Sequence, residues 1–200
     1  MNSRIVLFLL ACFIASGCDD SEKPLSDPKT SKADERLIGV WRESAGSTED
    51  YYHVGRAGKS FPVSMMRIVN VRHGNGEVDP PGEYLAFPTV LQGKNYLNMV
   101  IDPKQVKYLD ENGWKPEAVE CYTFLKYEVQ GDRLTVWLVD EQANERAVKG
   151  GKIKGMIGKN VAQFTDTTEN VARFVAEAGD SLLNTKEPGR FERVTVAKKP

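Results

Sequence analysis

The stretch CYTFLKYEVQGDRLTVWLV, residues 121–139, carries the clearest secondary-structure signal in the chain. It contains two runs rich in aromatic and β-branched residues, and the Gln-Gly-Asp sequence at 130–132 between them is typical of a turn. Three aliphatic residues of the second run alternate with Thr, Trp and Val, which is the period of a strand with one aliphatic face. The stretch predicts an antiparallel hairpin with arms over 121–129 and 133–139.

Shorter runs with a similar composition lie on both sides of this hairpin. Gly93 and its polar neighbours separate two of them and predict a second hairpin. Pro88 lies inside the first arm of that hairpin, and because proline has no amide hydrogen it favours an edge position or a bulge. The further strands expected from these runs are 37–41, 51–54, 65–71, 84–91, 96–101 and 191–196.

Two helices are expected to interrupt the strands. Asp140 is placed to cap a short helix that ends at Gly150 and Gly151. Asp166 and Glu169 form a capping-box-like pair at the start of a longer helix, which we expect to pack on the sheet or close one end of a barrel. The apolar stripe of this longer helix consists of Val171, Phe174, Val175, Ala178 and Leu182.

The length and composition are those of one globular domain. Hydrophobic residues make up 40% of the chain and charged residues 28%, and the formal net charge is −1. This charge leaves no basic excess to neutralise phosphates, so nucleic acid is not an expected partner. We expect residues 36–200 to form a single β-rich domain with antiparallel strands and one or two short helices.

The N-terminus has the layout of a secretory signal peptide over residues 1–17. Arg4 supplies a positive charge, an apolar run follows over 5–14, and small residues come next. The run is shorter than the roughly 20 apolar residues of a membrane-spanning helix, so we expect cleavage. The sequence Ala-Ser-Gly-Cys at 15–18 resembles the lipobox of bacterial lipoprotein signal peptides.

That resemblance implies a lipid on Cys18, which would become the new N-terminus and anchor the chain to a membrane of the cell envelope. The domain would face the periplasm or the exterior. Asp19 resembles the signal that retains lipoproteins in the inner membrane of enteric bacteria, but because this rule varies among bacteria, inner and outer membrane both stay open. Residues 19–35 are rich in Asp, Ser, Lys and Pro with the single apolar Leu25, so we expect 18–35 to comprise the lipidated cysteine and a flexible tether.

The two ends of the domain resemble those of lipocalin-like barrels. Gly39-Val40-Trp41 opens the first strand and Arg193 lies in the last one. In that family the glycine lets the strand bend, the tryptophan closes one barrel end, and the arginine lies across the indole. The resemblance implies a lipocalin-like barrel or half-barrel; a β-sandwich and an α+β fold are the alternatives. Residues 122–155 and the C-terminal Arg-Val also resemble small uncharacterised bacterial lipoproteins, from which no activity is inferred.

No set of residues in the sequence indicates catalysis, a metal site or a cofactor. Gly-Lys-Ser at 58–60 is not a P-loop, because His53 stands where the first glycine is required. His53 and His73 have no local partner with zinc-ligand spacing. The acidic pairs, such as Glu49 and Asp50, occur at expected loops and helix starts, where solvation and capping explain them.

The function favoured by the sequence is a lipid-anchored, non-enzymatic binding module. If it has a pocket, Tyr122, Phe124 and Trp137 are candidates to line it, although aromatic residues in strands usually belong to the core. The partner would be a small apolar ligand or an envelope protein. The alternatives are an accessory subunit of an envelope complex and a hydrolase of envelope polymers.

Overall fold

The computed structural model describes residues 20–45, 48–74, 77–78, 81–106, 121–158 and 162–195. Its barrel strands are β1 (Gly39–Ala45), β2 (Thr48–Arg56), β3 (Met66–Gly74), β5 (Gly82–Leu91), β6 (Lys94–Ile101), β7 (Thr123–Gln130), β8 (Arg133–Leu138) and β11 (Gly189–Arg193). The remaining elements are η2 (Glu35–Leu37), β4 (Glu77–Val78), α3 (Glu141–Lys149), β9 (Gly155–Ile157), β10 (Ala162–Phe164), α4 (Thr168–Ala178) and η3 (Gly179–Leu182).

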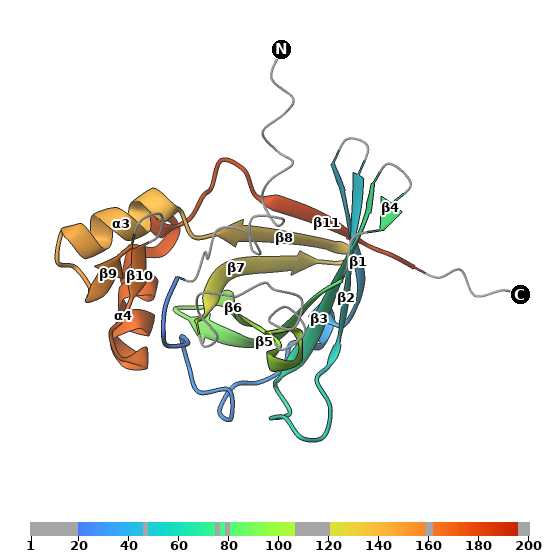
Figure 1. Cartoon of the computed structure of the whole chain (residues 1–200), viewed down its shortest axis with the longest axis horizontal. Coiled ribbons are helices and arrows are strands. Elements are labelled where there is room, and N and C mark those ends of the chain that lie inside the picture. Colours follow the sequence, from blue (N-terminus) through green and yellow to red (C-terminus); the bar gives the residue numbers. More distant parts are fainter. Residues whose placement is uncertain are drawn as a thin grey trace, which may run out of the picture.

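The eight barrel strands pair in the order β1-β2-β3-β5-β6-β7-β8-β11. Every pairing is antiparallel, and the pairing of β11 with β1 closes the barrel. β4 lies antiparallel beside the end of β3, beyond the stretch of β3 that pairs with β5. The predicted mainly β fold with a lipocalin-like antiparallel barrel is therefore confirmed in its closed form, and the hairpin over 121–139 is β7 and β8 (Figure 1).

The barrel wall separates two hydrophobic cores. The inner core fills the barrel, and the outer core lies between the wall and the helices. Figure 1 shows α3, α4, β9 and β10 gathered at one side of the barrel. Strand residues alternate between the two faces of a sheet, so a strand covered on both sides is apolar at successive positions. β7 shows this, because Phe124 joins the outer core whereas Leu125 joins the inner core.

Both predicted helices are present. α3 begins after Asp140, whose side chain accepts a hydrogen bond from the Ala143 amide at 2.7 Å. α4 is capped one residue later than predicted, because the Thr167 side chain accepts from the Asn170 amide. Asp166 instead accepts from the side-chain amide of Asn170 at 2.7 Å.

The described part of the predicted tether is not flexible but packs on the barrel from Asp20 onward. Ser21 exchanges backbone hydrogen bonds with Tyr122 at 2.7 and 3.1 Å. Leu25 is only 2% exposed and lies in the outer core. The tether prediction weighed only apolar content, whereas this segment is also held by backbone pairing with strand edges. Cys18 lies outside the described residues.

Pro88 helps to explain where this segment docks. β3 pairs with β5 only as far as Ala86, so one edge of β5 has no partner among the described strands at Pro88, as the proline predicts. The hydroxyl of Ser31 donates to the Pro88 carbonyl there. Nearby, the buried Asn98 side chain accepts from the Leu25 amide at 2.7 Å and donates to Thr89 at 2.8 Å.

Candidate ligand site inside the barrel

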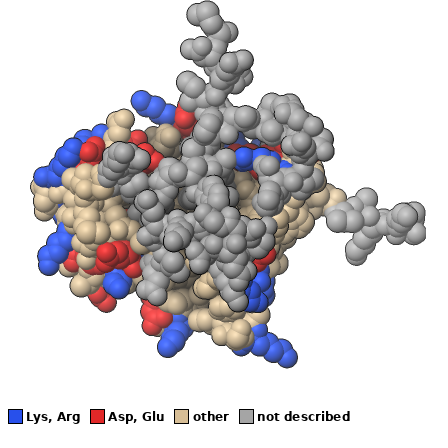
Figure 2. All heavy atoms as spheres, viewed as in Figure 1, with Lys and Arg blue, Asp and Glu red and all other residues tan. Residues whose placement is uncertain are grey.

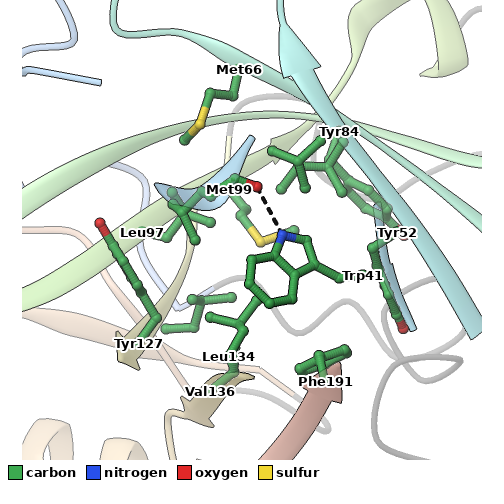
Figure 3. A pocket seen from close by; sticks show the side chains of 14 residues that line it. Trp41, Tyr52, Met66, Tyr84, Leu97, Met99, Tyr127, Leu134, Val136 and Phe191 are labelled. Carbon is green, nitrogen blue, oxygen red and sulfur yellow. Dashed lines mark hydrogen bonds between the residues drawn. The ribbon is translucent and has the colours of Figure 1, made fainter. Parts of the chain in front are cut away.

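The inner core encloses a cavity of about 70 Å³. Figure 3 shows side chains from strands all around the barrel converging on it. Its exposed lining is wholly apolar, because each strand turns its alternate, mostly aliphatic or aromatic residues inward. The lining residues are Leu37, Trp41, Tyr52, Val54, Met66, Ile68, Tyr84, Leu97, Met99, Leu125, Tyr127, Leu134, Val136 and Phe191.

One end of the cavity is closed around Trp41, which is fully buried. Its indole Nε1 donates to the Leu37 carbonyl at 2.8 Å, and the Arg193 guanidinium lies over the ring at 4.2 Å from the centroid. Arg193 also donates to the Ile38 carbonyl at 2.7 Å. Gly39 has φ +141°, and a Cβ there would lie 2.5 Å from Nη1 of Arg193. The structure therefore brings Gly39, Trp41 and Arg193 together at this end.

Polar side chains follow at the next inward positions beyond Trp41. Glu43 lies two residues after Trp41 on β1, and its cross-strand partner on β2 is Asp50. Asp50 in turn faces Arg72 on β3 and accepts from its guanidinium at 2.9 and 3.2 Å. We call Glu43, Asp50, Arg72, the Tyr52 hydroxyl and Asn70 the polar layer.

Two buried atoms of the polar layer lack hydrogen-bond partners within the described ranges. Tyr52 is only 7% exposed, yet its hydroxyl makes no hydrogen bond within the described part of the chain. The same holds for the side-chain oxygen of Asn70. Burial, reinforced by the charges of Asp50 and Glu43, raises the pKa of Tyr52 far above its usual value, so this group stays protonated. A buried polar atom without a hydrogen-bond partner lowers the stability of the fold unless a bound molecule supplies that partner.

Glu43 is the most perturbed carboxyl of the layer. Burial first, and then the nearby negative charge of Asp50, raise its pKa to about 7, although Arg72 partly opposes the shift. No ion pair joins Glu43 to another residue in the described ranges. The polar layer therefore holds a neutral donor at Tyr52, a neutral acceptor at Asn70 and a carboxyl that titrates near neutral pH.

The aromatic residues predicted to line a ligand pocket, Tyr122, Phe124 and Trp137, do not line this cavity. Phe124 is fully buried in the outer core, and Tyr122 packs there against the edge of Phe87 with ring centroids 6.4 Å apart. Trp137 lies on the outer face of β8, with Lys126 Nζ 4.5 Å from its ring centroid. Their neighbours Leu125 and Val136 line the cavity instead. The sequence shows the alternation, but with both faces apolar it does not show which face is inside.

Sequence reasoning missed the residues of the polar layer. The sequence did contain a signal for them. Residues two apart in a strand share a face, so Glu43 shares its face with Trp41 and Asp50 shares its face with Tyr52. From the sequence, Asp50 is expected in a loop, where solvation explains an acidic pair, but it lies in β2 opposite Glu43 and Arg72. Of the other residues considered, His73 is exposed and packs against Tyr51, with ring centroids 5.5 Å apart.

Across the described ranges, no group of three or more His, Cys, Asp or Glu residues is arranged to hold a metal ion. No helix within those ranges has the length and apolar character needed to cross a bilayer. Comparison of the chain with protein-family models, curated proteins and solved structures gave no significant match to any of them.

Proposed function

We propose that the protein is a lipid-anchored binding module whose barrel holds a small molecule with an apolar body and one polar head group. The observation that carries this proposal is the wholly apolar cavity whose wall includes Tyr52, the member of the polar layer whose hydroxyl has no hydrogen-bond partner in the described ranges. Apolar pockets with a few convergent polar groups and a perturbed pKa are the usual form of small-molecule sites. Cys18 would hold the module at an envelope membrane.

The apolar body would occupy the cavity. At about 70 Å³ the cavity is well below the roughly 300–1,000 Å³ of pockets for drug-sized ligands. It therefore suits a short chain or a small ring. Met66 and Met99 lie in its wall, and because methionine side chains adapt readily, they allow a longer chain to enter.

The head group would meet the polar layer. Arg72 is already paired with Asp50 by two hydrogen bonds, whereas no residue in the described ranges forms an ion pair with Glu43. A basic head group, such as an amine, would pair with ionised Glu43 and could donate to the free oxygen of Asn70. The proposed ligand class is therefore an apolar molecule with a basic head rather than a fatty acid.

The anchor is part of the same proposal. The lipobox-like sequence before Cys18 supports lipid attachment there. Labelling cells with a radioactive fatty acid should mark the wild-type protein and leave Cys18→Ser unlabelled and released from membranes. Continued incorporation of label by Cys18→Ser would refute the anchor.

Native mass spectrometry tests the ligand proposal. The full lipidated protein, extracted gently from the envelope of its own host, should carry a reproducible added mass. Leu97→Trp, which places a large ring in the cavity wall, should lose that mass, whereas Val63→Trp at an exposed position should keep it. A bare wild-type protein would count against a ligand and favour the accessory-subunit alternative, which in-cell crosslinking then tests.

The head-group preference needs its own measurement. Calorimetric titration with an alkylamine, an alkanol and an alkanoate of equal chain length should give the tightest binding for the amine. Glu43→Gln should remove that preference without abolishing binding of the alkanol. Tightest binding of the alkanoate would show that Arg72, not Glu43, selects the ligand.

One observation favours hydrolysis as a second candidate function. Glu43 and Asp50 are cross-strand partners, and one carboxyl has a raised pKa while the other is paired with Arg72. Two carboxyl groups in different environments are what an acid and base pair requires. Turnover of envelope polysaccharide by the wild type and its loss in both Glu43→Gln and Asp50→Asn would establish this function.

A further inference from the structure

The chain is fixed to the domain only two residues after Cys18. Asp20 accepts a hydrogen bond from the Phe124 amide through its side chain and from the Phe164 amide through its carbonyl, both at 2.8 Å. Two residues span at most about 7 Å. A lipid on Cys18 would therefore hold this face of the domain at the bilayer surface, with no long tether between them.

The direction of the chain at this point is set by strand pairing. Ser21 forms a parallel bridge with Phe164, so the step from Ser21 back to Asp20 runs in the same direction as the path from Phe164 back to Ala162. Ala162 is the cross-strand partner of Ile157 on β9. Asp20, the described residue nearest to Cys18, therefore lies beside β10 on the side of Ser21 that faces the end of the hairpin carrying Ile157.

That end of the hairpin exposes apolar side chains. Met156 is 55% exposed and Ile157 is 46% exposed, and both are among the few large hydrophobic residues exposed in the described ranges. Lys152 and Lys154 precede them and are also exposed. Figure 2 shows basic side chains along the edge of the molecule where α3 and β9 lie in Figure 1.

We propose that Met156 and Ile157 form a membrane-contact surface, with the bilayer that holds the Cys18 lipid as its occupant. The apolar side chains would enter the headgroup region, and Lys152 and Lys154 would pair with anionic phospholipids. This inference rests on the lipid anchor of the proposed function but not on the ligand. It fixes the orientation of the barrel at the membrane.

The test uses the full lipidated protein reconstituted into vesicles of phosphatidylglycerol and phosphatidylcholine. In a Cys121→Ser background, Ile157→Cys carries an environment-sensitive fluorophore, and Val63→Cys, whose native residue is 84% exposed, is the matched control. Lipids with a nitroxide on the acyl chain should quench the label at 157, whose emission also shifts to the blue. The label at 63 should show neither change.

Three outcomes decide the proposal. Equal, weak quenching at both positions in protein that floats with the vesicles overturns the contact surface and leaves the anchor standing. Protein that does not float overturns the anchor and the contact surface together. Replacement of Lys152 and Lys154 by Glu should lower quenching at 157 in anionic vesicles but not in vesicles of phosphatidylcholine alone, and an unchanged value in both overturns the proposed role of the lysines.

Discussion

At the scale of single residues, Gly39 has the tightest steric constraint at the closed end of the barrel. Its φ of +141° lies in a region that residues with a Cβ rarely adopt, and the guanidinium of Arg193 occupies the space where a Cβ would stand. Arg193 in turn covers Trp41 and donates to the carbonyl of Ile38. A glycine at this position therefore permits both the bend of β1 and the close approach of the arginine.

Gly39→Ala should destabilise the fold by about 1–3 kcal/mol, because it adds both backbone strain and a clash with Arg193. Chemical denaturation measures the change. In an Arg193→Ala background the clash is gone, so the same substitution should cost less, with only the backbone strain remaining. Equal costs in the two backgrounds would show that the arginine does not require the glycine.

Glu43 should make stability depend on pH. Its pKa is raised from 4.5 to about 7 in the folded protein, so the unfolded chain loses this proton first as the pH rises. The Glu43 carboxyl therefore does not lower the free energy of unfolding below about pH 4.5. Between pH 4.5 and about pH 7 its destabilising effect grows, and above pH 7 that effect is constant.

Glu43→Gln should consequently raise the melting temperature above pH 7 and leave it unchanged below pH 4.5. Thermal unfolding of both proteins across this range gives the comparison. Asp50→Asn breaks the ion pair with Arg72, so it should destabilise the protein near neutral pH. A wild-type advantage over Glu43→Gln at high pH would mean that ionised Glu43 has a partner.

At the scale of elements, the sequence was informative where the signal is local. The turn at Gly131, with φ +60°, and the alternation of β8 define one hairpin, and Asp140 with Gly150 bounds α3. The segment 20–34 was assigned wrongly because its order comes from distant partners. Tyr122, Phe164 and Asn98 hold it, and none of them is near it in sequence.

Leu25→Ala should show that this segment contributes to the fold. Leu25 is 2% exposed in the outer core beside Phe124, so truncation should cost about 2–5 kcal/mol. Val63→Ala, at an exposed site, should cost almost nothing. The free energy of unfolding in urea distinguishes the two, and an equally small effect of Leu25→Ala would mean that the segment is a tether after all.

At the scale of the whole molecule, the sequence predicted β-strands but could not establish that they close. Closure requires β11 to pair with β1 through Trp41 and Arg193, which lie at opposite ends of the domain sequence. The expectation of closure came from the resemblance to lipocalin-like barrels, which rests on three residues. The interior could not be assigned from the sequence. β7 is covered on both sides, and the polar layer arises only from the register of three strands.

The central claim is that the barrel binds a small molecule in its cavity. The measurement that tests it most directly is a methyl NMR titration of methionine-labelled protein with an alkylamine. The claim predicts saturable shifts of the Met66 and Met99 methyls, which line the cavity, and no shift of the exposed Met156. Unmoved Met66 and Met99 signals at saturating alkylamine, alkanol and alkanoate would contradict it.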